Sequence, residues 1–154
     1  MKLLFVCMGN ICRSPAAECV MRTLLRKEGL ESEISCDSAG TLGYHEGEGP
    51  DSRMITAGRK RGFQIAGSSR PIIKKDIKEF DLIITMDNQN YENVIKLAKF
   101  SDKKKVVPFC NYVKNHSDTE VPDPYYGGID GFDYVIDLLF DGCQEILNSI
   151  KQKN

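Results

Sequence analysis

Residues 5–15 read FVCMGNICRSP, and the rest of the sequence can be placed around them. The apolar run from Leu3 to Val6 predicts a buried strand that delivers the chain to Cys7. Ser14 and Pro15 then open a segment with helical spacing of apolar residues; serine favours a helix N-cap, and proline favours the first helical position. We therefore expect a strand, a tight loop and a helix start, in that order.

This order predicts an anion-binding loop made from the backbone. A helix N-terminus leaves N–H groups unpaired with a partial positive charge behind them, and successive loop amides can curl around a tetrahedral oxyanion. Gly9 and Asn10 suit such a loop because both accept a positive φ more readily than other residues. We expect Asn10 also to hold the loop through its side-chain amide. The residues expected to bind phosphate or substrate here are Met8, Gly9, Asn10, Ile11, Cys12 and Ser14.

Two side chains of this loop predict a reaction centre. Cys7 ends the strand and faces the helix N-terminus, a position that favours the thiolate, which is the nucleophilic form. Arg13 offers a planar fork of donors that fits two oxygens of a phosphoryl group. Ser14 can donate its hydroxyl to the thiolate. The alternative for Cys7 is a small buried apolar residue, but its position five residues before Arg13, between strand and helix, favours a nucleophile.

Four segments carry a resemblance to a known family. They are Val6–Pro15, Asp37–Gly40, Phe80–Asp87 and Asp123–Gly128. In this order and at these separations they resemble the low-molecular-weight protein tyrosine phosphatases, and the likeness covers essentially the whole chain. The resemblance implies a compact α/β domain and a two-step hydrolysis of phosphotyrosine through a cysteinyl-phosphate, with no cofactor and no metal.

Attack of Cys7 on phosphorus needs an acid for the leaving group, and Asp123 is the best candidate. It lies in a long polar connection beside Pro124, where Tyr125 and the tyrosine after it can wall an aromatic substrate. The alternative is that Asp123 only begins a turn before Pro124. Its motif position within the resemblance favours catalysis, and Asp118 is a weaker candidate for the same role.

Several other residues have two interpretations each. Tyr44 aligns with an aromatic position of the family and is expected at one side of the pocket mouth, or else it is an exposed loop tyrosine. Asp87 either orients Arg13 or caps the helix that follows it. Cys12, by the resemblance, forms a reversible disulfide with Cys7 that protects the nucleophile, or else it is a packed thiol. The two histidines have no partner pattern and are assigned no role: His45 and His116.

The apolar spacing along the chain predicts an alternation of strands and helices. Turn-forming residues separate them, and two polar connections stand out, at 39–53 and 110–131. Together these elements predict an α/β fold. We expect a single doubly wound domain, residues 1–154, with a four-stranded parallel sheet flanked by helices and the phosphate loop after the first strand. Strands are expected at 2–6, 33–37, 80–86 and 105–108, and helices at 15–28, 51–61, 74–79, 88–97 and 132–151.

Composition limits the partners and the compartment. The chain has 154 residues and a formal net charge of −1, which does not favour nucleic acid or a membrane surface as a partner. Six cysteines without a signal-like segment suggest reduced thiols in the cytoplasm. The absence of a Cys-x2-Cys pair makes a zinc site unexpected. We expect a cytoplasmic monomer or weak dimer that acts on phosphotyrosine proteins and holds inorganic phosphate or a similar oxyanion in its loop.

Three rival functions are weighed against phosphotyrosine hydrolysis. Arsenate reduction resembles this fold and loop but needs further thiols near the nucleophile, and residues 80–95 contain no cysteine. A related phosphoarginine phosphatase carries threonine at the position of Ile11, so isoleucine favours an aryl phosphate. A non-catalytic phosphate- or phosphopeptide-binding module has no need of Cys7, Arg13 and Asp123 together.

Overall fold

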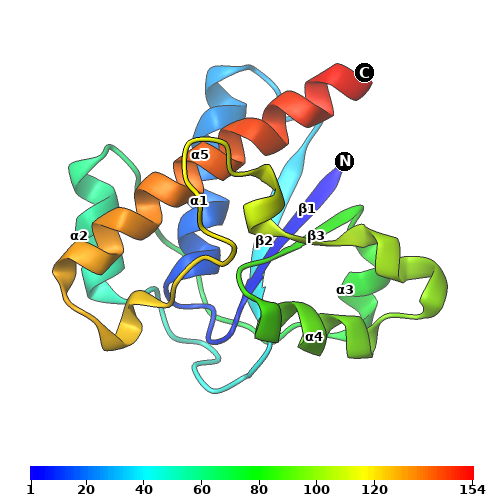
Figure 1. The fold of residues 1–154 in the computed structure, drawn as a ribbon, viewed down its shortest axis with the longest axis horizontal. Helices are drawn as coiled ribbons and strands as arrows, with labels where there is room; N and C mark the ends of the chain where they lie inside the picture. The colour runs from blue at the N-terminus through cyan, green and yellow to red at the C-terminus, as the bar shows by residue number, and fades with distance from the viewer.

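The centre of the molecule is a four-stranded parallel sheet in the order β2-β1-β3-β4. The computed structural model describes residues 1–154 (Figure 1). Strand β1 is central, pairing with β2 up to Cys7↔Gly40 and with β3 up to Val6↔Thr85. The expected parallel sheet is confirmed, and its strands are β1 Lys2–Cys7, β2 Ser35–Gly40, β3 Leu82–Thr85 and β4 Val106–Pro108.

Helices cover both faces of the sheet, as expected for a doubly wound fold (Figure 1). Leu3 and Phe5 of β1 pack into the larger apolar core with α1, α2 and α5, whereas Leu4 and Val6 point to the other face and pack into a smaller core with α3 and α4. The apolar run of β1 lacks alternation because both faces are buried. The helices are α1 Arg13–Lys27, α2 Ser52–Lys60, α3 Lys74–Glu79, α4 Asn88–Leu97 and α5 Ile129–Lys153.

Some predicted boundaries were wrong. Strand β2 continues to Gly40, beyond the expected end at residue 37, because its pairing with β1 holds up to that residue. Helix α5 begins at Ile129 instead of Phe132, so the polar connection before it is shorter than expected. That connection is also not structureless, since it contains short 3-10 helices at Phe109–Tyr112 and Pro124–Tyr126. A further 3-10 helix, Phe100–Lys105, precedes β4.

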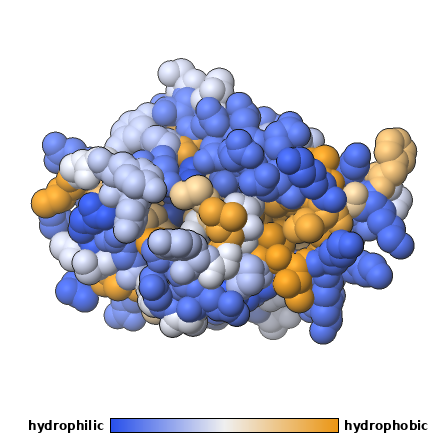
Figure 2. Space-filling view, turned by 90° about the horizontal axis from the view of Figure 1, so that it is seen from below, coloured by the Kyte–Doolittle hydropathy of each residue, from blue (hydrophilic) through white to orange (hydrophobic).

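The carboxyl ends of the four parallel strands all lie at one end of the molecule, which is where ligands bind in sheets of this kind. Figure 2 looks at this end from below and shows apolar side chains near the centre of a largely hydrophilic surface. None of the helices combines the length and the apolar character that crossing a bilayer would require.

Substitution of Gly142 by alanine should destabilise the protein. Gly142 lies in α5, and a Cβ there would overlap the ring of Phe109, which is fully buried. We expect Gly142→Ala to lower the free energy of unfolding by about 1–3 kcal/mol, as overpacking of a core typically does, measured by urea denaturation.

Gly131→Ala in the same helix is the matched control. The nearest atom to a Cβ at Gly131 is 3.7 Å away, an ordinary contact distance. Alanine should therefore add up to about 1 kcal/mol of stability there through its helix propensity. Equal stability of the two variants would contradict the close packing of α5 on Phe109.

Candidate active site

The loop after β1 turns directly into α1. Cys7 ends the strand and is 2% exposed, and α1 begins at Arg13 with Cys12 in the N-cap position. The expectation that Ser14 caps this helix was therefore wrong, because the helix begins two residues earlier than Pro15. Pro15 still lies in the first turn, where its missing N–H removes no intrahelical hydrogen bond. The Ser14 hydroxyl is left free for other contacts.

Asn10 fixes the shape of this loop. Its φ is 57°, and it is the one non-glycine residue of the chain with a positive φ. Its side-chain amide Nδ2 donates to the hydroxyls of Ser14, at 2.8 Å, and Ser38, at 3.0 Å. Its Oδ1 accepts from the backbone N–H of Arg70 at 3.0 Å. The loop is thus tied from behind to α1, to β2 and to the segment before α3.

Gly9 has a different reason to be glycine from the one expected. Its φ is not positive. The ring of His45 lies against it instead, with Cδ2 3.1 Å from the place where a Cβ would stand. His45 is held there by Glu48, whose Oε2 is 2.7 Å from Nδ1. A side chain at position 9 would displace this ring.

Two hydrogen-bonding groups converge on the sulfur of Cys7. The backbone N–H of Asn10 donates to Sγ at 3.3 Å, and the hydroxyl of Ser14 lies 3.0 Å from the same atom. Both contacts are buried. Donors in such positions stabilise negative charge on a sulfur more than on a neutral thiol.

The guanidinium of Arg13 is buried, with its side chain 3% exposed, and it faces three acceptors. Nη1 donates to Asp87 Oδ2 at 2.7 Å and to the carbonyl of Val121 at 3.0 Å, and Nη2 lies 3.4 Å from Asp123 Oδ2. Burial alone would lower the pKa of Arg13, but Cys7 and the two aspartates outweigh it and raise the pKa. The side chain therefore stays a cation.

Asp87 has both of the roles considered for it. Its Oδ2 accepts from Arg13, and its Oδ1 accepts from the backbone N–H of Asn90 at 2.8 Å, which caps α4. The Asn90 side chain returns a contact to the backbone N–H of Asp87 at 3.2 Å. The carboxylate is thereby fixed by α4 before it meets the arginine.

Asp123 likewise combines a turn and a place in the site. Its Oδ1 accepts from the backbone N–H of Tyr125 at 3.0 Å and caps the 3-10 helix there, while Oδ2 faces Arg13. Its side chain is 28% exposed and so reaches solvent. Asp118, the weaker candidate, is bonded to the hydroxyl of Tyr134 and lies outside the cavity.

A cavity of about 40 Å³ brings most of the predicted residues together. Asn10 and Ser14 stand behind the loop and not in the cavity wall. Tyr44 lies outside it, 85% exposed and edge-on to His45 at 5.1 Å. The lining residues are Cys7, Met8, Gly9, Ile11, Cys12, Arg13, His45, Asp123, Tyr125 and Tyr126.

No sequence pattern pointed to His45, which stands in a polar loop but forms part of the cavity wall, with its ring 6.3 Å from that of Tyr125. Cys12 also lines the cavity. Burial, followed by the charges of Asp51 and Cys7, raises the pKa of Cys12, which favours its thiol form. Its disulfide with Cys7 stays a prediction. No cluster of three or more His, Cys, Asp or Glu side chains is placed to hold a metal ion.

A larger groove of about 510 Å³ lies elsewhere, between α1 and residues 62–67. It contains none of the residues predicted for the site. We place the candidate active site at the smaller cavity because that is where the buried arginine, the aspartate and the cysteine meet.

Comparison with known proteins supports this assignment. Residues 2–154 match the sequence profile described as "Low molecular weight phosphotyrosine protein phosphatase". A Synechocystis protein named provisionally as a low molecular weight protein-tyrosine-phosphatase is 49% identical over 153 residues, covering 97% of this chain and 96% of its own. A crystal structure of a protein tyrosine phosphatase from Entamoeba histolytica superposes with a TM-score of 0.98 at 46% identity, covering 99% of this chain and 98% of the other.

The same fold also occurs in a structure described as a Drosophila arginine phosphatase. It has a TM-score of 0.91 and 31% identity, and the match covers 98% of both chains. The fold therefore does not by itself separate the two phosphoryl substrates.

Removing the charge of Asp87 should destabilise the fold, because the buried Arg13 loses its shortest ionic contact. Asp87→Asn keeps the cap of α4 and should lower the free energy of unfolding by about 1–3 kcal/mol. Asp87→Ala also removes the cap and should lose about 1 kcal/mol more. Urea denaturation measures both.

Glu28→Gln serves as control, since Glu28 pairs with Lys151 at an exposed site, with both side chains more than 40% exposed. It should change stability by less than about 0.5 kcal/mol. If Asp87→Asn changes the free energy of unfolding as little as this control does, the Arg13–Asp87 contact does not stabilise the fold.

Proposed function

This chain belongs to the low molecular weight phosphotyrosine protein phosphatase family, and we propose that Cys7, Arg13 and Asp123 carry out its hydrolysis of phosphotyrosine. The family is cysteine-dependent and works through a cysteinyl-phosphate. One observation carries the assignment of roles: a cysteine sulfur with two converging hydrogen-bonding groups, a buried arginine and a solvent-reaching aspartate line one cavity.

Binding of the phosphoryl group is assigned to the loop amides of Met8 to Arg13 and to the guanidinium. Nη1 of Arg13 donates to Asp87 and to the carbonyl of Val121, and one N–H of Nη2 is directed at Asp123. Nε and a second N–H of Nη2 have no protein partner, so they can donate to two oxygens of the phosphoryl group. Charge that develops on those oxygens during transfer is stabilised by the same donors.

In the first step the sulfur of Cys7 attacks phosphorus, an S–P bond forms and the bond from phosphorus to the phenolic oxygen breaks. Asp123, protonated at this stage, gives its proton to that oxygen and releases tyrosine. In the second step Asp123 takes a proton from water, the water oxygen bonds to phosphorus, and the S–P bond breaks. Inorganic phosphate leaves and the Cys7 thiolate returns, stabilised by the Ser14 hydroxyl and the Asn10 amide.

The substrate class follows from the cavity wall. His45 and Tyr125 both line the cavity, with their ring centroids 6.3 Å apart, and Tyr44 lies outside it with its ring edge-on to that of His45. Aromatic walls suit the ring of a phosphotyrosine side chain. The proposed substrates are phosphotyrosine-containing proteins in the cytoplasm, where reducing conditions protect Cys7 from oxidation, and the proposed state is a monomer or weak dimer.

Hydrolysis of an aryl phosphate by the purified protein with a metal chelator present tests these roles. Wild type should remain active, and Cys7→Ser should be inactive. Asp123→Asn should lose about 10²- to 10⁴-fold in kcat, the usual range for a general acid. If wild type is inert but still binds vanadate, the enzyme interpretation is wrong and the alternative of a phosphate-binding module takes its place.

The side chain of Ile11 should help to select the ester over a phosphoramidate. Ile11 is 7% exposed and lines the cavity beside the nucleophile. Ile11→Thr opens space and adds a hydroxyl, so the ratio of phosphoarginine to phosphotyrosine peptide hydrolysis should rise. Val20→Thr, a similar change in the core of α1 away from the cavity, should leave the ratio unaltered; an equal rise in both variants would remove Ile11 from substrate selection.

A further inference from the structure

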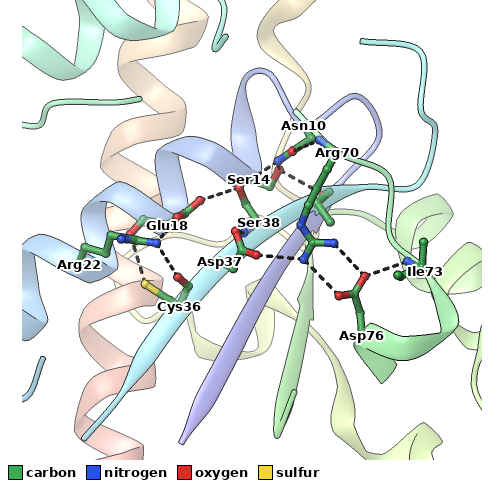
Figure 3. A network of polar contacts seen from close by, with 11 residues as sticks. Asn10, Ser14, Glu18, Arg22, Cys36, Asp37, Ser38, Arg70, Ile73 and Asp76 are labelled. Atoms are coloured by element: carbon green, nitrogen blue, oxygen red, sulfur yellow. Dashed lines mark hydrogen bonds and ion pairs between the residues drawn. The ribbon is translucent and has the colours of Figure 1, made fainter. Parts of the chain in front are cut away.

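Behind the phosphate loop, hydrogen bonds run from Ser14 through Asn10 and Ser38 to the acidic residue Glu18 of α1 (Figure 3). Cys7 Sγ lies 3.0 Å from the hydroxyl of Ser14, which accepts from Asn10 Nδ2 at 2.8 Å. The same amide nitrogen donates to Ser38 Oγ at 3.0 Å, and Ser38 donates to Glu18 Oε2 at 2.7 Å. The chain of contacts has no gap.

The carboxylate of Glu18 sets the direction of the contacts nearest to it. An ionised carboxylate can only accept, so the single proton of the Ser38 hydroxyl is committed to Glu18. The oxygen of Ser38 is then left as an acceptor for Asn10, which is the role that the Asn10 amide requires of it.

The orientation continues to the sulfur. The Arg70 backbone N–H holds Oδ1 of Asn10, so the NH₂ group must face the two serines. Ser14 therefore accepts a hydrogen bond from Asn10 and can donate its own hydroxyl hydrogen to another acceptor. That acceptor is Cys7 at 3.0 Å, since the competing carbonyl of Ala39 is 3.4 Å away.

Glu18 is mostly buried and has both a positive and a negative neighbour. Its side chain is 15% exposed, and Arg22 on the same helix face pairs with its Oε1 at 2.6 Å. Asp37 of β2 is the nearby like charge, and the segment 62–69 that closes over this region presents only uncharged residues. Burial, with a smaller part from Asp37, raises the pKa of Glu18 against the lowering effects of Ser38 and Arg22.

We propose that Glu18 is a positioning residue for the reaction: by keeping Ser38 an acceptor for the Asn10 amide, its carboxylate acts together with the Arg70 backbone N–H to orient the Ser14 hydroxyl toward the sulfur of Cys7. The inference rests on the proposed role of Cys7 as nucleophile. Glu18 itself touches neither substrate nor sulfur, and its effect is to keep one hydrogen bond on the thiolate in a single orientation.

The sign of the pKa shift separates this role from a stabilising one. A carboxyl whose pKa is higher in the folded than in the unfolded state stabilises the fold only in its protonated form, and that stability is lost as pH rises through the folded pKa. In its ionised form Glu18 thus disfavours the folded state. A neutral isostere should cost activity without costing stability.

The test is Glu18→Gln, assayed with p-nitrophenyl phosphate at neutral pH. We expect kcat to fall about three- to tenfold, the scale that one hydrogen bond supplies, with KM unchanged. The melting temperature should be equal to or above that of wild type. Glu31→Gln is the matched control, since Glu31 pairs only with the exposed Arg26, and its kcat should equal that of wild type.

Two further measurements show whether the effect passes through Ser38. Glu18→Gln should have no effect in a Ser38→Ala background, because the link is already cut; independent, additive losses would overturn the inference. The ratio of wild-type to Glu18→Gln kcat should also fall toward one as pH drops and Glu18 takes up its proton. A ratio that does not change with pH would overturn it as well.

The outcome for wild type separates this inference from the proposed function. If wild type hydrolyses the substrate and Glu18→Gln matches it, only the role of Glu18 is wrong. If wild type is inert, or if Cys7→Ser remains active, the nucleophile itself is misassigned and the role of Glu18 falls with it.

Discussion

The buried charge of Arg13 is the constraint on which the rest of the site depends. A guanidinium out of contact with water is tolerated only when its donors are matched by acceptors. Here these come from two segments far along the chain, Asp87 at the start of α4 and the stretch from Val121 to Asp123 before α5. The end of β1, the end of β3 and the loop that leads to α5 must therefore meet at one point, which is also where the nucleophile lies.

Different interactions hold the phosphate loop on its two sides. On the cavity side, charge dominates: the cysteine sulfur, the arginine and Asp123 line one small space, and Asp87 pairs with the arginine beside it. On the opposite side, neutral hydrogen-bonding groups of Asn10 and Ser38 link the loop to the sheet, and the first charge appears only at Glu18. This separation keeps the thiolate close to one permanent cation while its hydrogen bonds stay directional.

The features that could be predicted from the sequence are those that local sequence patterns determine. The parallel sheet followed from apolar runs separated by helical spacing, and Cys7 and Arg13 followed from their place between a strand and a helix. The partners of Arg13, the wall residue His45 and the link from Ser38 to Glu18 depend on contacts between residues 20 to more than 100 positions apart, which no local pattern records. For the link to Glu18 the sequence did contain a partial signal. Ser14, Glu18 and Arg22 follow one another at four-residue spacing, which places them on one face of α1.

The left-handed backbone of Asn10 has a consequence for how ligands arrive. Every contact that fixes this residue comes from the protein itself, through Ser14, Ser38 and Arg70. The shape of the cradle thus rests on the protein's own hydrogen bonds, which lower the entropy cost of ordering the loop around a ligand. Association of a small oxyanion is then governed by diffusion through a narrow aromatic mouth and by electrostatic attraction to Arg13, so ionic strength should alter its on-rate more than its off-rate.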